Sequence, residues 1–221
     1  SISFFPVILL VLLFRSFLLE PFQIPSGSMI PTLEVGDFIV VNKFAYGLRV
    51  PVLGTRFVDI GEPTNGDVMV FIPPHKNEYF IKRVIGIPGD TVTYDENKML
   101  TINGEVVERT LIARVPPARP NTVVYQETIG DSVHWIHTNT NRSSVRDACK
   151  SPQGVVRNGR CEYVIPDGAY LMMGDNRDQS DDGRRWGLVA EENIIGQAFA
   201  IWVHKDPGFK LPTFKRNGMI P

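Results

Sequence analysis

Two serines lie in a short segment bounded by prolines, Pro25-Ser26-Gly27-Ser28-Met29-Ile30-Pro31. The prolines fix φ and disfavour a regular hydrogen-bond ladder, while Gly27 allows a close approach of the backbone to another group. A serine held on such a bend can present its hydroxyl and a neighbouring backbone N–H to the same point, as nucleophilic catalysis requires. An ordinary exit loop has a similar composition, so this segment alone is a weak signal.

A lysine, Lys82, lies within a run of strand-forming residues. In a strand it shares a face with Phe80 and Val84, and such apolar neighbours penalise the ammonium form. An unperturbed lysine has a pKa near 10.4 and is only about 0.1% neutral near pH 7.5, so it cannot act as a base. A buried Lys82 is therefore a candidate general base, whereas an exposed one would be an edge-strand lysine that prevents aggregation.

A dense polar loop spans residues 174–187 after an apolar strand and is suited to internal hydrogen bonds and charge pairs. Its acidic residues lack the glycine and glutamate spacing of an EF-hand, so we expect no metal here. No Ser–His–Asp triad has a well-placed candidate. The four histidines are scattered, and we expect them to be solvated: His75, His134, His137 and His204.

The rest of the chain must position these clusters, and its pattern is that of a mostly β protein. Of its 221 residues, 43% are hydrophobic and 21% charged, which excludes wholesale disorder. The net charge of −1 gives no general attraction to phosphate, so no nucleic-acid partner is expected. Short runs broken by Gly, Pro and Asp predict strands over Phe38–Phe44, Asp67–Ile72, Phe80–Ile87, Tyr170–Gly174 and Ile194–Val203.

Further strands are expected after residue 90. Thr91–Tyr94 and Leu100–Ile102 are predicted to form a hairpin, and Asn103–Gly104 a tight turn into Val106–Val107. Between about residues 116 and 158 the strand pattern weakens and Thr, Asn, Arg and Ser become frequent. This change predicts an insertion with longer loops.

The two cysteines, Cys149 and Cys161, lie in polar surroundings near the end of that insertion. If the region lies outside the cytoplasm, a disulfide is their natural state. Closing a loop of about a dozen residues would stabilise the fold by roughly 3 kcal/mol in the chain-entropy model. The alternative is two unrelated free thiols.

The chain begins with a strongly apolar stretch, Ile2–Leu19, interrupted by Arg15. As a helix it would be roughly 27 Å long, close to the ~30 Å hydrocarbon layer of a bilayer. No small-x-small cleavage site follows it, because no alanine occurs before Ala45. We therefore expect a membrane anchor that stays attached, with a buried soluble helix as the alternative.

In this order, the clusters resemble bacterial type I signal peptidases, the membrane-bound Ser–Lys endopeptidases that remove signal peptides from secreted proteins. The likeness covers nearly the whole chain except the weakly patterned insertion, and the long insertion and intact Glu20–Met29 segment resemble a Gram-negative member. The matching segments are Arg15–Phe17, Glu20–Met29, Gly36–Asp37, Lys82–Arg83, Gly86–Asp90, Gly174–Asp178 and Ser180.

The resemblance implies a role for each matching position. Ser28 corresponds to the nucleophile, Lys82 to the general base, and Ser26 to the residue whose hydroxyl joins the Ser28 backbone N–H in the oxyanion hole. Ser180 matches the serine that orients the lysine amine. Supporting roles fall to Asp175, Arg177, Asp182 and Arg184, and shallow apolar substrate pockets to Phe22, Ile24, Met29, Leu33, Phe80 and Ile81.

The resemblance also implies the setting of the reaction. It implies cleavage after small residues in an Ala-x-Ala pattern, without metal or cofactor, by a monomer in the bacterial inner membrane whose catalytic part faces the periplasm. Signal peptides and the lipid bilayer are then the expected partners. The expected organisation is a transmembrane segment (1–19), a catalytic β-core (20–90 and 169–221) and an inserted β-rich subdomain with long loops (91–168).

Two other functions compete with this interpretation. Self-cleaving repressors of the LexA type share a related Ser–Lys core, but they predict an N-terminal DNA-binding unit where this chain has an apolar stretch. A non-catalytic membrane-anchored β domain that binds a partner would leave Lys82 solvated, with an ordinary pKa. The burial of Lys82 therefore distinguishes an enzyme from a binding module.

Overall fold

The computed structural model describes residues 4–6, 19–46, 48–49, 56–58, 61–114, 121–140 and 149–221. Most of the expected membrane segment, residues 7–18, lies outside these ranges. Within them, no helix is both long enough and apolar enough to cross a membrane.

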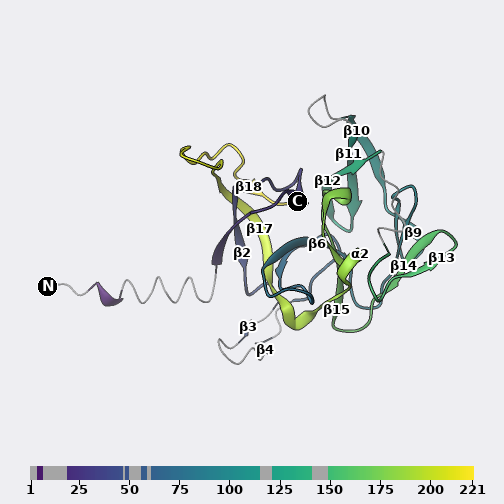
Figure 1. Ribbon diagram of the computed structural model, residues 1–221. Helices are drawn as coiled ribbons and strands as arrows, with labels where there is room; N and C mark the ends of the chain where they lie inside the picture. The colour runs from purple at the N-terminus through teal and green to yellow at the C-terminus, as the bar shows by residue number, and fades with distance from the viewer. Residues whose placement is uncertain are drawn as a thin grey trace.

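The main element is an antiparallel sheet of eight strands, and it confirms the mostly β prediction (Figure 1). All five strands predicted before residue 90 and after residue 169 are present, with ends shifted by a few residues. In spatial order the sheet contains β1 (Leu19–Gln23), β2 (Asp37–Asn42), β17 (Ile194–His204), β5 (Val68–Phe71), β6 (Phe80–Gly86), β15 (Ala169–Met173) and β16 (Val189–Ala190), and β18 (Gly218–Met219) pairs with β17.

Residues between β6 and β15 form two further sheets. The first has the order β13 (Val155–Arg157), β14 (Arg160–Val164), β7 (Thr91–Asp95), β8 (Leu100–Ile102) and β9 (Glu105–Val106). The second consists of β10 (Arg109–Arg114), β11 (Thr122–Ile129) and β12 (Ser132–Asn139). The short remaining elements are the strand pair β3 (Leu48–Arg49) and β4 (Arg56–Val58), the 3-10 turns η1 (Gly27–Met29), η2 (Arg177–Gln179) and η3 (Glu191–Asn193), and helix α2 (Gly183–Trp186).

The predicted hairpin and tight turn are confirmed. β7 pairs with β8, and β8 turns back into β9 through Asn103 and Gly104, whose φ angles are 53° and 86°. Asparagine and glycine tolerate this left-handed region better than other residues, which is why the pair marks the turn in the sequence.

The loops predicted between residues 116 and 158 are wrong for the stretch that forms β11 and β12. These two eight-residue strands pair along their whole length. Their polar residues Glu127, His134 and His137 are buried rather than solvated, so the strands carry polar side chains on faces that point into the protein. Because a hydrophobic alternation requires apolar inward positions, this burial hides the strand pattern in the sequence.

A hydrophobic core under the N-terminal strands holds the segment that carries Ser28. Met29 and Leu33 are completely buried and pack in one cluster with Ile24, Ile39 and Ile81. The same short segment therefore supplies both core residues and a polar residue between them. The burial of Met29 fixes η1 against the sheet.

Cys149 and Cys161 form a disulfide, as the first of the two alternatives predicted. Their polar sequence neighbours were misleading about their surroundings, because Cys161 is fully buried in a core cluster with Tyr94 and Tyr163. The backbone N–H groups of the two residues after Cys149 donate to the carbonyl of Arg184, so the bridge also restrains helix α2.

Replacing both cysteines with alanine (Cys149→Ala with Cys161→Ala) should lower the free energy of unfolding by roughly 3 kcal/mol, because the bridge closes a loop with a sequence separation of 12. Chemical denaturation of the two proteins measures this difference. A reductant should destabilise the wild type and leave the double variant unchanged. Equal unfolding free energies without reductant would contradict a stabilising bridge.

Candidate active site

Ser28 lies on η1, in the connection between β1 and β2. The connection is pinned at both ends, because Ile24 N–H donates to Asp37 O at 2.8 Å and Leu33 N–H donates to Met29 O at 2.9 Å. Ser28 itself is 8% exposed and borders a cleft. The turn thus holds one hydroxyl at the surface of a rigid core.

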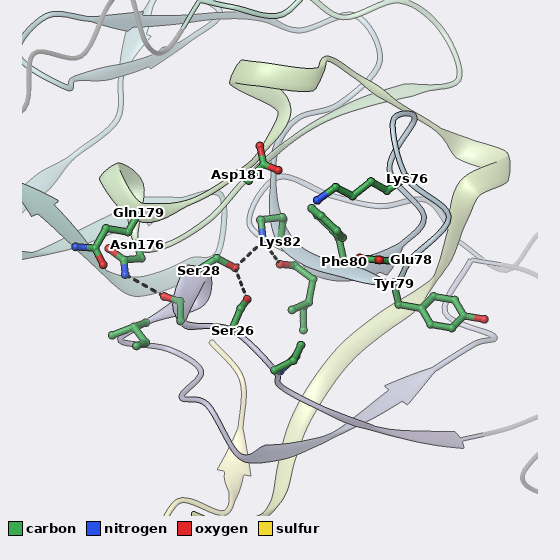
Figure 2. A pocket seen from close by; sticks show the side chains of 14 residues that line it. Ser26, Ser28, Lys76, Glu78, Tyr79, Phe80, Lys82, Asn176, Gln179 and Asp181 are labelled. Carbon is green, nitrogen blue, oxygen red and sulfur yellow. Dashed lines mark hydrogen bonds between the residues drawn. The ribbon is translucent and has the colours of Figure 1, made fainter. Parts of the chain in front are cut away.

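Lys82 reaches this hydroxyl from β6. Its Nζ lies 2.6 Å from Ser28 Oγ and donates a second hydrogen bond of 2.9 Å to the carbonyl of Ile81 (Figure 2). β6 lies between β5 and β15, so Lys82 is not on an edge strand, and its side chain is only 3% exposed. These observations exclude the edge-strand and solvated alternatives for this lysine.

Burial lowers the pKa of Lys82 from its ordinary 10.5 to about 8. The carboxylates of Asp182, Asp181 and Asp175 oppose this shift, while Arg184 supports it. With a pKa near 8, a large fraction of the amine is neutral in mildly alkaline water. Lys82 can therefore accept the proton of the hydroxyl that it contacts.

Ser26 places a second hydroxyl beside the nucleophile, with its Oγ 3.4 Å from Ser28 Oγ. Ser28 is the second residue of η1, so its backbone N–H belongs to the first turn, which has no partner within the turn itself. A backbone N–H and a neighbouring hydroxyl are the kind of donors that stabilise an oxyanion.

The loop after β15 carries a buried ion pair, Asp182 with Arg184. Two hydrogen bonds of 2.8 Å join the guanidinium to the two carboxylate oxygens, and Gly174 N–H donates to Asp182 Oδ2 at 3.0 Å. Burial alone would raise the pKa of Asp182, but the Arg184 charge holds it below its usual range. Asp182 also caps helix α2, so the pair fixes the loop close to Lys82.

A second buried ion pair joins Asp175 to Arg83. The sequence did not predict this pair, because only Asp175 was expected to support the site. Asp175 receives hydrogen bonds from Arg83 Nε and Nη2, at 3.0 and 2.8 Å, and from the Thr32 hydroxyl at 2.5 Å. Although burial raises the pKa of Asp175, Arg83 outweighs it and lowers the value to about 2. This cluster ties the loop to β6 and to the segment just after η1.

Arg177, the remaining basic residue expected to support the site, binds the carboxylate of Glu127 on β11 through both terminal nitrogens. Asp178 contacts Lys98 at 2.7 Å. Nothing in the local sequence marks Glu127 or Lys98 as partners, since each is many residues distant. The one signal that could suggest buried pairing is a single charged residue, Glu127, in an otherwise strand-like stretch.

Ser180 lies beside the dyad but is not seen to orient the lysine. Its hydroxyl is buried and makes no hydrogen bond to Lys82, but it lies close enough to Asp182 to help lower the pKa of that carboxyl. The space around it is tight: a Cβ at Gly174 would lie 2.3 Å from Ser180 Oγ and 2.5 Å from Ser28 O. Only glycine at position 174 allows the end of β15 to approach the nucleophile turn this closely.

A cleft of about 670 Å³ opens at Ser28 and Lys82. Of the six residues expected to form substrate pockets, Phe80 and Ile81 line it, whereas Ile24, Met29 and Leu33 are buried in the core and Phe22 is partly buried against that core. Several other residues that line the cleft were not predicted from the sequence as functional. These are Pro25, Gly27, Ile30, Lys76, Glu78, Tyr79, Asn176, Gln179 and Asp181.

The prediction of solvated histidines is wrong for His134 and His137, and the side chain of His204 is only 12% exposed and contacts Asp37 at 2.7 Å. His134 is 1% exposed and His137 is 8% exposed, and both lie on β12 rather than on a helix. His134 lies next to Glu127 in the interior, with 3.5 Å between Nε2 and Oε2. In the part of the chain that the structure describes, no three His, Cys, Asp or Glu side chains are grouped to hold a metal ion.

A family model described as "Signal peptidase, peptidase S26" matches residues 1–203. The chain belongs to this family. Its relatives include the Signal peptidase I of Pseudomonas aeruginosa, 48% identical over 99% of this chain and 77% of that protein, and that of Haemophilus influenzae, 37% identical over 91% and 68%. Membership confirms the resemblance found in the sequence and leaves the repressor alternative without support.

Among solved structures, a signal peptidase I from Enterococcus faecalis is similar, at 23% identity and a TM-score of 0.35, covering 63% of this chain and 98% of that chain.

Replacing Lys82 with methionine should stabilise the fold, because at neutral pH the wild type buries an ammonium whose pKa has fallen from 10.5 to about 8. That shift corresponds to about 3 kcal/mol. Both states of the wild type are protonated below pH 8, so the full cost is present there. Between pH 8 and 10.5 the folded state loses its proton first, so wild-type stability rises with pH.

Denaturant unfolding of the wild type and Lys82→Met at pH 7 and pH 10.5 measures the effect. The advantage of the variant should be largest at pH 7 and shrink by about 3 kcal/mol at the higher pH. Lys205→Met, at an exposed lysine, is the matched control and should show no such pH dependence. A pH-independent difference for Lys82→Met would mean that the amine is not desolvated.

Proposed function

We propose that the chain is a serine endopeptidase that removes N-terminal signal peptides from exported preproteins. The contact that carries the proposal is the 2.6 Å hydrogen bond between buried Lys82 Nζ and Ser28 Oγ. It joins a nucleophile to a base of lowered pKa at the floor of an open cleft. Membership in the peptidase S26 family and the names of the curated relatives support the same activity.

The reaction proceeds in two halves. Neutral Lys82 takes the Ser28 proton while Oγ attacks the scissile carbonyl, and the resulting oxyanion is bound by the Ser28 N–H and the Ser26 hydroxyl. The amide C–N bond breaks, Lys82 returns the proton to the leaving amine, and an ester links substrate and Ser28. Lys82 then takes a proton from water, the hydroxide attacks the ester carbonyl, and the C–O bond to Ser28 breaks as Lys82 returns that proton to Oγ, which releases the carboxyl product.

The proposed substrate is an extended chain with small residues at the first and third positions before the cut. β1 is the terminal strand in the order of the described sheet, and it leads directly to the cleft. A peptide paired with such an edge directs alternate side chains to one side. Phe80 and Ile81 line the cleft, and the core residues Phe22, Ile24, Met29 and Leu33 are proposed to limit the depth of the two pockets.

We also propose that residues 1–19 anchor the enzyme in the bacterial inner membrane with the catalytic part in the periplasm. Ser28 follows Leu19 by nine residues, which would keep the nucleophile close to the lipid surface. Large apolar side chains near the C-terminus are exposed, as expected of a surface that meets lipid. They are Trp202, Phe209, Leu211 and Phe214.

The division into a catalytic core and an insertion is proposed as well. β6 and β15 are neighbours in the main sheet although residues 87–168 separate them in sequence. The intervening residues form their own two sheets, as an insertion between adjacent strands would. Residues 91–168 are therefore proposed as the inserted subdomain, and 20–90 with 169–221 as the core.

The variants Ser28→Ala and Lys82→Met should each lower the cleavage rate of a purified preprotein by at least about 10⁴-fold, because neither half of the dyad works alone. Both should remain folded, which thermal unfolding checks, and Lys205→Met should retain activity as the matched control. In the wild type, kcat/KM should rise with pH and level off above about pH 8, as Lys82 loses its proton. Sustained turnover by either dyad variant would overturn the proposed function.

Ser26→Ala should lower kcat by about 10²–10³-fold with little change in KM, because its hydroxyl meets the negative charge that forms only in the transition state. Steady-state kinetics on a short signal-peptide substrate separates the two parameters. An unchanged kcat would remove Ser26 from the oxyanion hole.

A further inference from the structure

Asn176 holds the turn that carries the nucleophile by two hydrogen bonds. Its side-chain Nδ2 donates to Gly27 O at 2.9 Å, and its backbone N–H donates to Ser28 O at 3.0 Å. The residue immediately precedes η2, is 7% exposed, and lines the cleft (Figure 2). None of the roles derived above for the reaction uses it.

The first of these bonds acts on the peptide that matters for the oxyanion. Gly27 C=O and Ser28 N–H belong to the same planar peptide unit, in which the two groups point in opposite directions. Holding the oxygen therefore sets the direction of the hydrogen. We propose that Asn176 is a positioning residue that aims the Ser28 N–H at the oxyanion, an inference that rests on the proposed peptidase function.

The second bond acts on the next peptide along the chain. Ser28 C=O and Met29 N–H form that unit, so Asn176 restrains the peptides on both sides of the Ser28 Cα. Rotation of Ser28 about φ or ψ would break one of the two bonds. Its hydroxyl and its N–H are thereby kept in a fixed relation, which matters because small misplacements of catalytic groups are costly in rate.

Asparagine suits this role better than its close relatives. The amide donates a proton to Gly27 O and so polarises the peptide, which strengthens the N–H at its other end as a donor. The isosteric carboxylate of aspartate has no proton to donate and would face the carbonyl oxygen at 2.9 Å. Alanine would leave the peptide free to rotate on that side.

The chain around Asn176 keeps it in place. Asp175, the preceding residue, is fixed by Arg83, and its carbonyl accepts from His137 N–H at 2.9 Å on β12. Asn176 O in turn accepts from Gln179 N–H at 2.9 Å, within η2. The amide is therefore attached to a rigid part of the loop and not to a mobile tip.

The test compares Asn176→Ala and Asn176→Asp with the wild type on a signal-peptide substrate. We expect kcat to fall about 10- to 100-fold for alanine and further for aspartate, with KM changed less than about threefold. A peptide aldehyde, whose adduct with Ser28 carries an oxyanion, should lose affinity by about the same factor as kcat/KM. An uncleavable peptide that mimics only the bound substrate should bind as before.

The pH midpoint of kcat/KM for Asn176→Ala should remain that of the wild type, because the Lys82–Ser28 contact is intact. Asn176→Asp adds a carboxylate to the cleft and so favours the ammonium form of Lys82, which leaves the alanine variant as the test of the midpoint. Asn65→Ala serves as the matched control, since its Nδ2 makes a similar 2.9 Å bond to a backbone carbonyl, that of Ile85, outside the cleft. It should lower thermal stability and retain kcat within about twofold. If Asn176→Ala does not fold, Asn176→Asp, which keeps the size and the backbone bond, gives the answer alone.

Three outcomes would overturn the proposal: wild-type kcat in a folded Asn176 variant, an equal loss of affinity for the uncleavable peptide, or a shifted pH midpoint in Asn176→Ala. Each of these leaves the wild type active. A wild type that cleaves no preprotein would instead refute the proposed function, so the two failures are distinguishable.

Discussion

A buried lysine amine, 2.6 Å from a serine hydroxyl, is the constraint on which the rest of the structure depends. Lys82 keeps its proton in water and loses it readily only when desolvated, so the fold must bury a group that prefers solvent. It does so by placing the residue on a central strand between β5 and β15, under the turn that carries Ser28. Burial of Lys82 lowers the stability of the fold, and in return it provides a neutral amine that can act as a base.

Desolvation alone would not suffice, because three carboxylates lie near enough to Lys82 to favour its charged form. The structure counters two of them with arginines: Arg83 binds Asp175 and Arg184 binds Asp182, each through two nitrogens. The Arg184 charge itself lowers the Lys82 pKa and so opposes the effect of Asp182. The buried ion pairs thus fix the loop, and the one with Arg184 also favours the neutral amine.

Much of the core could be predicted from the sequence, because it depends on local patterns: alternating strands and the Asn103–Gly104 turn. A lysine among apolar residues made Lys82 a candidate base, whereas the pairing of Ser28 with Lys82 came from the resemblance to a known family. The partners of the buried charges could not be predicted, because Arg83 and Asp175 are 92 residues apart and Glu127 and Arg177 are 50 apart. β11 and β12 could not be predicted either, because some of their inward-facing residues are polar. The same holds for the walls of the cleft, which come from several loops. Hydrophobic periodicity in a sequence reveals the buried face of a strand only when the side chains on that face are apolar.

The close approach at Gly174 has a consequence for biosynthesis. Ser28 and Lys82 are synthesised before the strand that covers one side of β6, which begins at Ala169, and before the loop that meets the nucleophile turn. A nascent chain that ends before residue 174 leaves the amine open to solvent and therefore charged. Hydrolytic capacity thus arises only after β15 and the loop that follows it have been synthesised and have packed against β6 and the nucleophile turn.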